Sequence, residues 1–445
     1  MAGAAGAATR VTRRPARPLG EGRSARPNRN ARGLRQFIAS LGPGLITGAA
    51  DDDPSGIATY SIAGAAFGYL PLWTVLFSFP LMTAVQLMCA RLGMVTGSGL
   101  AGVIRRRYPT PVLWAACALL IVANVINVSA DLGGMAEATS MVTGVGASLW
   151  LPAYAILIVL LLVWSSYGTI ARVFKWLTLT LLTYVGTAIV ANADWRSALT
   201  ATIVPRVVWS RDFFAMLVAV LGTTISPYLF FWQAAQEVEE ERATGRNLRH
   251  RRGASARALR TARSDVVAGM FSSNAVAFFI ILTAAATLHR SGVTHVSSAQ
   301  QAAEALRPLA GDAAYWLFTL GLIGTGMLAV PVLAGSCAYA VAEAAAWRGS
   351  LDQPPRRARG FYAVLGVAML IGWVLNYAGW NAIRMLLVTA VINGVLAPPL
   401  ILIVVLLTRD RKVMGDAVSS QALDLLGWIA FIVMLGAALG LLIGS

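Results

Sequence analysis

Charged residues are scarce in this sequence of 445 residues. Only 13% of the side chains are Asp, Glu, Lys or Arg, against about 25% in an ordinary soluble domain. A soluble protein covers its surface with such side chains, so the shortage argues against a water-soluble enzyme or a soluble nucleic-acid-binding domain.

Cysteine and histidine are also rare, with three of each. Cys89, Cys117 and Cys337 fall inside apolar stretches at no metal-binding spacing, so they are predicted to be packing residues without a disulfide framework. Nothing resembles a nucleophile elbow, a phosphate-binding loop or a zinc-protease helix. We therefore expect no enzyme activity and no resident cofactor.

Long apolar stretches, by contrast, are abundant. Hydrophobic residues make up 57% of the chain, and its mean hydropathy is +0.67. The sequence therefore predicts an all-α, polytopic membrane protein whose partner is the lipid bilayer. Eleven stretches have the length and hydropathy of membrane-spanning helices: 38–66, 71–96, 112–138, 149–168, 173–191, 212–236, 265–288, 313–346, 360–376, 384–407 and 426–443.

The positive charges lie between these stretches. The net charge is +16, but an N-terminus in the cytoplasm makes every second connection cytoplasmic, and all five of these connections are basic. The outward connection at 192–211 is a mild exception, because it contains Arg196, Arg206 and Arg211. We therefore expect a multi-pass protein of the cell membrane, with a cytoplasmic N-terminus, an extracellular C-terminus and no nucleic-acid partner.

Three carboxylates interrupt the first apolar stretch, in GLITGAADDDPSGIATY. Pro54 lacks an amide proton and disfavours helix at the preceding residue, so this span should break at Asp53. A carboxylate at such a break, deep in the membrane, by default marks an ion or substrate pathway. Helical geometry points Asp51 and Asp52 elsewhere, and we expect them to be solvated in a vestibule or paired with arginine.

The sixth stretch is interrupted in the same way, in AVLGTTISPYLFFWQAAQEVEEE. Two interrupted spans five positions apart fit an inverted repeat in which the breaks face each other near the midplane and form the substrate site. The alternative interpretation of the sixth stretch is a simple helix kink at Pro227. The sequence therefore predicts eleven transmembrane helices, arranged as an inverted repeat of five plus five with helices 1 and 6 broken, and with the eleventh outside the repeat.

The predicted domain organisation follows from this repeat. The acids Glu237, Glu239, Glu240 and Glu241 should form a solvated cytoplasmic end of the sixth span, where they could attract exiting cations. The expected parts are a disordered basic cytoplasmic tail at 1–36, a first repeat at 37–191, an extracellular connection at 192–211, a second repeat at 212–407 with a basic cytoplasmic loop at 241–263, and a linker with the eleventh helix at 408–445.

Several collinear segments resemble the Nramp family of divalent-metal transporters. They are GPGLITGAADDDPSGIATYSIAGAAFGYLPLW, ARLGMVTGSGLAGVIRRRYP, ADLGGMAEA and SPYLFFWQAAQE, and the resemblance covers residues 38–407. It implies an amino-acid/polyamine/organocation-type fold and import of a divalent cation by alternating access. No obligate protein partner is inferred.

The chain departs from the family's motifs at the expected metal site. The family's Asp-Pro-Gly-Asn maps onto Asp53 with Gly56 in place of the asparagine, and its Ala-x-x-Met-Pro-His maps onto Thr223, Ser226, Pro227 and Tyr228. Because a hydroxyl replaces the soft thioether, the oxygen-only set favours Mg²⁺ or Mn²⁺. The pattern is similar to the Nramp-related magnesium transporters.

The resemblance and these departures define the predicted site. The predicted metal-site residues are Asp53, Gly56, Ala50, Thr223 and Ser226, and Asn393 and Tyr228 are expected to contact the ion or its waters. For Asn393, the alternative role is a polar contact between helices.

The resemblance also implies a proton path, of which Asp131 survives. Gly134 stands in place of the second acid and Tyr228 in place of the histidine, while Glu137 could substitute only partly. A buried acid tied to serine or backbone groups is the alternative for Asp131. We therefore expect transport that is not obligatorily proton-coupled.

Three other functions remain as alternatives. One is an ordinary proton-coupled Mn²⁺ or Fe²⁺ symporter of the Nramp type. The others, from a different class, are a cation channel and a metal-sensing membrane receptor. The two central breaks favour gated access over a continuous pore.

Overall fold

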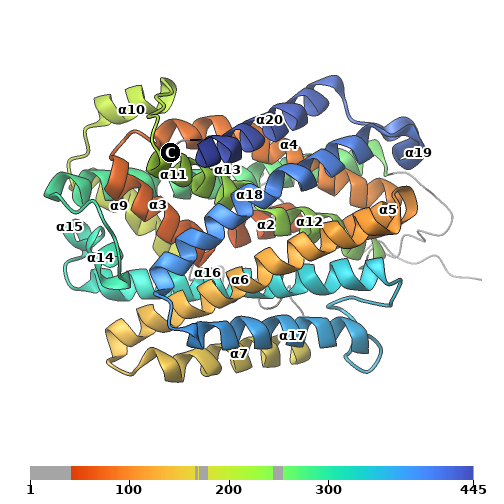
Figure 1. Cartoon of the computed structure of the whole chain (residues 1–445), viewed down its shortest axis with the longest axis horizontal. Coiled ribbons are helices and arrows are strands. Elements are labelled where there is room, and N and C mark those ends of the chain that lie inside the picture. The colour runs from red at the N-terminus through yellow and green to blue at the C-terminus, as the bar shows by residue number, and fades with distance from the viewer. Residues whose placement is uncertain (1–41, 166–168, 170–178, 244–253, 444–445) are drawn as a thin grey trace, which may run out of the picture. The chain divides into compact units, whose positions relative to one another are not determined.

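Every regular element among the described residues is a helix (Figure 1). The computed structural model describes residues 42–165, 169, 179–243 and 254–443. Within these residues, nine helices are long and apolar enough to cross a membrane. They are α4 (Leu72–Thr96), α6 (Thr110–Thr143), α7 (Ala147–Trp164), the pair α11 (Arg211–Thr224) and α12 (Pro227–Ala243), α13 (Ala256–Thr287), α16 (Ala313–Ala344), α17 (Arg359–Leu375), α18 (Ala382–Arg409) and α20 (Gln421–Ile443).

Shorter helices lie at the positions of the two remaining predicted spans. The first corresponds to α2 (Pro43–Asp51) and α3 (Pro54–Phe67). The fifth corresponds in part to η1 (Leu179–Leu181) and α9 (Leu182–Val190). The rest of the fifth span, the basic tail at 1–36 and part of the loop at 241–263 lie outside the described residues, so the total of eleven spans stays a prediction.

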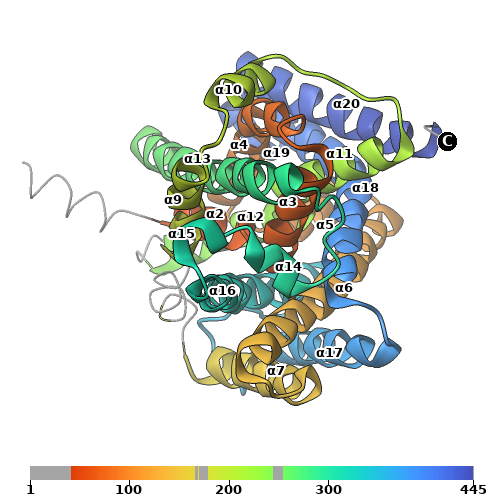
Figure 2. The same cartoon turned by 90° about the vertical axis from the view of Figure 1, so that its left-hand side faces the viewer.

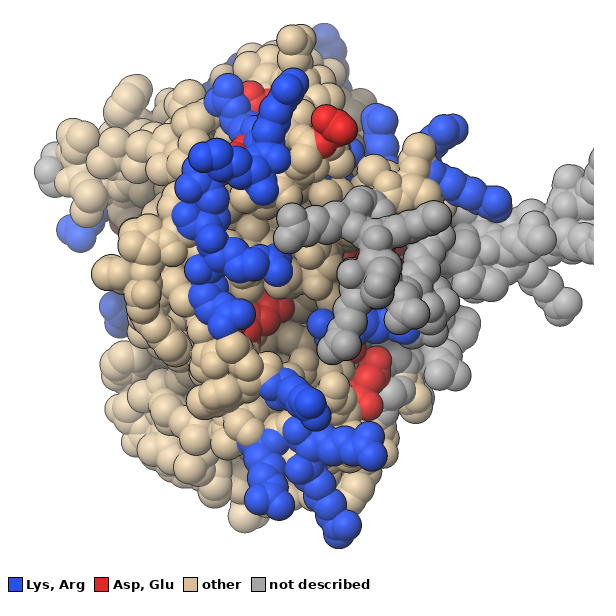
Figure 3. Space-filling model, turned by 90° about the vertical axis from the view of Figure 1, so that its right-hand side faces the viewer, with Lys and Arg blue, Asp and Glu red and all other residues tan. Residues whose placement is uncertain are grey.

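Short helices lie at the two ends of the spans. In Figure 1, α5 and α19 lie at one end, and α14 and α15 lie at the other. Figure 3 looks onto the end with α5 and α19, where lysine and arginine side chains gather; we call it the basic face. The short elements are α5 (Leu100–Arg107), α10 (Trp195–Ile203), η2 (His289–Ser291), α14 (Ala299–Glu304), α15 (Arg307–Ala310), η3 (Asn376–Ala378), α19 (Arg411–Met414) and η4 (Gly415–Ala417).

The first span breaks where the sequence predicts. Helix α2 ends at Asp51, and α3 begins at Pro54 with Asp53 as its N-cap. The Asp53 carboxylate accepts a hydrogen bond of 2.6 Å from the Gly56 amide. The first amide N–H groups of a helix have no hydrogen-bond partner within the helix. Pro54 has no N–H group, so it loses nothing at this position, and the Asp53 carboxylate accepts the hydrogen bond of another of these amides. The same few residues therefore end one helix and begin the next.

The sixth span breaks in the same manner, which confirms the second predicted interruption. Helix α11 ends at Thr224 and α12 begins at Pro227. The Ser226 hydroxyl between them donates to the carbonyls of Thr223, at 2.8 Å, and Gly222, at 3.1 Å. A side chain thus takes up carbonyl groups that the interrupted helix leaves free.

The broken sixth span lies at the centre of the bundle. The most apolar part of α11 and α12 is 89% buried, whereas the corresponding parts of α7, α17 and α20 are 28% buried. Figure 2 accordingly shows α7 and α17 at one edge and α20 at the opposite edge. A span that lipid cannot reach is the kind that tolerates a break in its backbone hydrogen bonds.

Glycines bring both broken spans close to their neighbours. A Cβ on Gly48 of α2 would lie 2.3 Å from the carbonyl oxygen of Gly269 in α13. A Cβ on Gly222 of α11 would lie 2.2 Å from the carbonyl oxygen of Ala390 in α18. Only glycine allows backbones this close, a common way of packing helices in membranes.

Candidate metal site

Oxygen atoms from both breaks converge on Asp53. Its Oδ1 accepts hydrogen bonds from the Gly56 amide at 2.6 Å and the Ser55 hydroxyl at 2.9 Å. From the first turn of α12, the Tyr228 hydroxyl lies 3.4 Å from Asp53 Oδ2 and donates to the Ala50 carbonyl at 3.1 Å. The two breaks therefore face each other through Asp53, Ala50 and Tyr228.

Thr223 lies on another side of the same carboxylate. A Cβ on Gly56 would lie 3.1 Å from Thr223 Oγ1 and 3.4 Å from Asp53 Oδ1, so both oxygens flank the glycine. Thr223 Oγ1 is buried and has no hydrogen-bond partner among the described residues. Leaving a buried hydroxyl unpaired is costly. This oxygen is therefore available to a cation or to a water molecule.

The structure brings together four of the five residues predicted for the metal site: Asp53, Gly56, Ala50 and Thr223. Ser226 lies in the sixth-span break and donates to the Thr223 carbonyl, which leaves its oxygen lone pairs free. The side chains of Asp53, Thr223 and Ser226 are each 1% exposed, and Ala50 is fully buried. The site is thus closed to bulk water in this conformation.

The chemistry of the site is that of oxygen donors. Nowhere in the described part of the chain do three or more His, Cys, Asp or Glu side chains form a group suited to holding a metal ion. A cation beside Asp53 would meet one carboxylate together with carbonyl and hydroxyl oxygens, and would complete its shell with water. Hard cations that keep some of their hydration shell suit such a site.

Asp131 of α6 is buried near this group and interacts electrostatically with Asp53. The backbone amide of Ser55 also interacts with it, but neither carboxyl oxygen has a partner at hydrogen-bond geometry among the described residues. Asn393 of α18 is likewise 1% exposed, and both atoms of its carboxamide lack a partner in the same described set. Both side chains have unused hydrogen-bonding capacity in the protein interior.

Two other positions bear on the expected proton path, Gly134 and Glu137, and neither presents a free acid. A Cβ on Gly134 would lie 3.0 Å from Leu386, so this position faces an apolar side chain. The Glu137 carboxylate accepts a hydrogen bond of 3.4 Å from the amide of Ala299 at the start of α14. Glu137 is therefore engaged with α14.

The expectation that Asp51 and Asp52 are solvated or paired with arginine is wrong. They are 0% and 6% exposed, and their carboxylates share the hydroxyl of Ser273 in α13. Ser273 Oγ lies 2.6 Å from Asp51 Oδ2 and 3.1 Å from Asp52 Oδ1. The close packing of α2 on α13 buries both acids, and nothing in the local sequence reveals which helix covers α2.

The acids at the end of α12 are also less solvated than expected. Glu237 is 3% exposed and accepts a hydrogen bond of 2.9 Å from Gln233, and Glu241 is 8% exposed. Glu240 is exposed, as predicted. Burial follows from the position of α12 inside the bundle, which its run of acids does not disclose.

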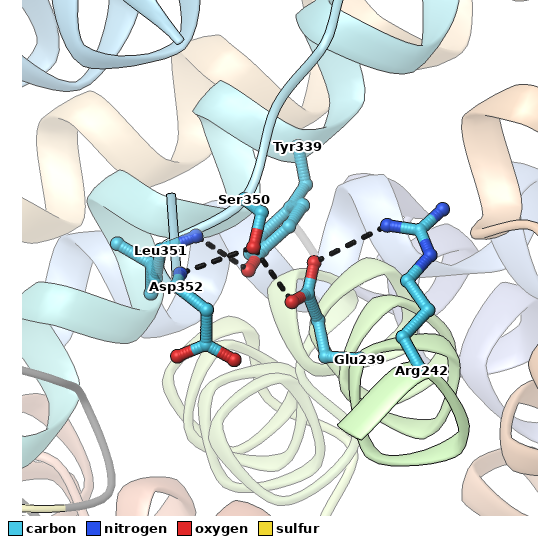
Figure 4. A network of polar contacts seen from close by, with 6 residues as sticks. All are labelled: Glu239, Arg242, Tyr339, Ser350, Leu351 and Asp352. Carbon is cyan, nitrogen blue, oxygen red and sulfur yellow. Dashed lines mark hydrogen bonds and ion pairs between the residues drawn. The ribbon is translucent and has the colours of Figure 1, made fainter. Parts of the chain in front are cut away.

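Glu239 ties the end of α12 to the connection between α16 and α17 (Figure 4). It accepts a hydrogen bond of 2.6 Å from Ser350 and forms an ion pair of 3.6 Å with Arg242. Nearby, the Tyr339 hydroxyl accepts a hydrogen bond of 3.2 Å from the Leu351 amide. These contacts border a cavity of about 500 Å³, which Glu239 and Arg242 help to line.

Solved transporter structures share this fold. The manganese transporter of Eremococcus coleocola, in complex with an aromatic bis-isothiourea substituted compound, is 19% identical, with a TM-score of 0.71 over 96% of this chain and 88% of that one. MhsT in complex with L-phenylalanine is 12% identical, with a TM-score of 0.60 over 90% of this chain and 98% of the other. Mhp1, a nucleobase-cation-symport-1 family transporter, is 13% identical, with a TM-score of 0.56 over 90% of each chain. At these identities the similarity shows the fold.

The family itself follows from the sequence match. The model of the family described as natural resistance-associated macrophage protein-like, or Nramp, matches residues 44–444. The match includes both broken spans and every element that contributes an oxygen to the site around Asp53. This multi-pass membrane protein belongs to the Nramp family.

Proposed function

We propose that this protein is a secondary transporter that imports divalent metal cations by alternating access. The observation that carries the proposal is the convergence of the Asp53 carboxylate, the Ala50 carbonyl and the unpartnered Thr223 hydroxyl where two half-helices meet. Facing breaks near the midplane form the substrate site in transporters built from inverted repeats. Ser226 and the backbone at Gly56 complete the proposed site, and Asn393 and Tyr228 contact the ion's waters.

Mg²⁺ and Mn²⁺ are the proposed substrates. Both prefer oxygen ligands, whereas later transition metals gain more from sulfur and nitrogen. The polar groups around Asp53 are all carboxylate, carbonyl, hydroxyl and amide groups, and Ser226 stands where the family has methionine. Manganese is named as the substrate of the Eremococcus coleocola transporter, which supports keeping Mn²⁺ beside Mg²⁺.

Import is proposed to proceed without obligatory proton coupling. Gly134 and Tyr228 occupy two of the three positions of the family's proton path, which leaves Asp131 as the remaining acid. An inward-negative potential favours cation entry by about 2.3 kcal/mol per charge per 100 mV, and roughly twice that for a divalent ion. The potential alone is therefore sufficient to drive import.

The proposed orientation places the basic face in the cytoplasm. Exposed arginines of α5 and of the segment at 409–412 lie on this face, together with those of the connection between α16 and α17 (Figure 3). The positive-inside rule then places the N-terminus in the cytoplasm and the C-terminus outside the cell membrane.

Metal uptake into proteoliposomes tests the proposal. The purified protein is reconstituted, a panel of Mg²⁺, Mn²⁺, Fe²⁺ and Cd²⁺ is added outside, and metal and pH indicators are read inside. We expect saturable uptake of Mg²⁺ and Mn²⁺ and counterflow of metal against a preloaded lumen. Stoichiometric acidification would instead establish the proton-coupled symporter, uptake without counterflow would indicate a channel, and the absence of uptake would favour a sensor.

A further inference from the structure

An apolar groove lies between α11, α18 and α20, at the end of the spans opposite to the basic face. Figure 2 shows α11, α18 and the C-terminal end of α20 together at one edge of the molecule. The groove has a volume of about 710 Å³, within the range of about 300–1,000 Å³ typical of ligand sites. Apart from two arginines, its lining consists of Ala, Leu, Val and Ile side chains.

The two arginines come from the first turns of two helices. Arg211 begins α11, and Arg384 lies in the first turn of α18. Both residues are exposed, and among the described residues no carboxylate lies within ion-pair distance of either guanidinium. The amino-terminal ends of the two helices add positive partial charge. Asp212 follows Arg211 in α11 but does not line the groove, so one end of an otherwise apolar groove carries two guanidinium groups and no carboxylate.

Arg211 and Arg384 lie on the side of the membrane where arginines are usually rare. Arginines are disfavoured in short connections on the side of a membrane opposite to the basic face, and Arg211 belongs to the connection that departs from this rule. Exposed apolar residues surround the groove: Val388 is 38% exposed and Leu442 is 76% exposed. The groove thus opens toward lipid and has its cationic end where the lipid headgroups would lie.

We propose that this groove binds a phospholipid of the leaflet opposite to the basic face. Arg211 and Arg384 hold the phosphate, and one acyl chain lies along Val388 and Leu442. Guanidinium groups pair with phosphate oxygens through two parallel hydrogen bonds. The apolar walls of the groove contact the acyl chain in place of neighbouring lipids. A free phosphate ion matches only the cationic end, and a metal cation is repelled by it.

The groove is connected to the metal site through its own walls. Further along α11 lies Thr223, and further along α18 lies Asn393. These helices touch directly, because a Cβ on Gly222 would lie 2.2 Å from the Ala390 carbonyl oxygen and 2.3 Å from the Gly394 amide. A lipid wedged between their outer ends should therefore change the transport rate, a consequence that rests on the proposed function, whereas the binding itself does not.

Native mass spectrometry of the purified full-length protein tests the binding without any metal. Phosphatidylglycerol is the probe, and we expect one tightly held molecule per chain. Charge-assisted hydrogen bonds are lost in the variant Arg211→Gln/Arg384→Gln, so its affinity for the probe should fall about tenfold or more. Val388→Trp fills the groove without changing the charge and should weaken binding similarly.

A matched control removes the same charge at the same end of the molecule. Arg196 and Arg206 line a separate cavity of about 330 Å³ near α10, so Arg196→Gln/Arg206→Gln should retain the lipid. Equal loss in this control would reduce the effect to general surface charge and overturn the proposal. Full displacement by inorganic phosphate, with normal binding in Val388→Trp, would make the groove a plain anion site and also overturn it.

Discussion

Gly56 and Thr223 share one space between the two breaks: a Cβ at position 56 would lie 3.1 Å from Thr223 Oγ1. The family pattern that this sequence resembles has asparagine at the first position and alanine at the second. Here the small residue and the larger one have exchanged places. We interpret these two departures as one change, in which a hydroxyl from the sixth span occupies room beside a glycine in the first.

Gly56→Asn should lower Mg²⁺ uptake roughly tenfold or more, because crowding a packed interior typically costs about 1–3 kcal/mol. Adding Thr223→Ala removes the crowded hydroxyl and should restore most of the uptake. Initial rates in proteoliposomes measure both effects. Gly366 of α17, whose Cβ position has no neighbour within 4 Å, provides the control variant Gly366→Asn. Unchanged uptake by the single Gly56 variant would refute the shared-space interpretation.

Asp53→Asn should abolish metal uptake while preserving the fold. Asparagine is as good an N-cap as aspartate, so the start of α3 keeps its hydrogen bond from the Gly56 amide. The substitution removes only the negative charge of the carboxylate, which is proposed to hold the cation. The matched control is Asp194→Asn, the same substitution at the N-cap of α10. Transport at the original rate by the Asp53 variant would remove Asp53 from the metal site.

Ser226→Met should raise the apparent affinity for Cd²⁺ more than that for Mg²⁺, because a thioether favours soft metals. Ser226→Leu introduces similar bulk without sulfur and should show no such preference. Competition of Cd²⁺ against Mn²⁺ uptake measures the change in each variant. If Cd²⁺ outcompetes Mg²⁺ by orders of magnitude in the unmodified protein, the oxygen-ligand argument is incorrect.

Gly48→Ala should separate α2 from α13. The added Cβ would lie 2.3 Å from the Gly269 carbonyl oxygen, and backbone must move to relieve the contact. We expect Tm to fall by several degrees and a cysteine introduced at Ser273 to react faster with a thiol reagent. Gly366→Ala adds the same methyl group in open space and should leave Tm unchanged or slightly higher, because alanine favours helix. An equal Tm for both variants would contradict the packing argument.

Proton release should not accompany metal entry. In proteoliposomes, Mg²⁺ or Mn²⁺ influx is expected to acidify the lumen no more than a metal-free control, and an imposed inward-negative potential should drive uptake. A lone Asp131 would have to supply the whole proton path, because Gly134 faces Leu386 and Glu137 is engaged with α14. Acidification that follows metal entry and disappears in Asp131→Asn would establish a working path instead.

Sequence alone determined the nine long apolar spans of the described residues, the two breaks and the residue types around them. Hydrophobic length defines a membrane helix, and the Asp53-Pro54 and Ser226-Pro227 pairs end and begin helices through local backbone chemistry. These effects act within a few residues of the chain. The convergence of the two breaks was also predicted, from an expected inverted repeat that would place the two broken spans opposite each other.

Contacts between distant helices were decided by the tertiary structure. The shared bond of Asp51 and Asp52 to Ser273, the contact of Glu239 with Ser350 and the groove between Arg211 and Arg384 all depend on which helix faces which. A membrane helix that is apolar on all sides carries little periodic signal to show which face is covered. Close packing of glycines then selects the neighbour, and this selection buried acids that local sequence would leave in water.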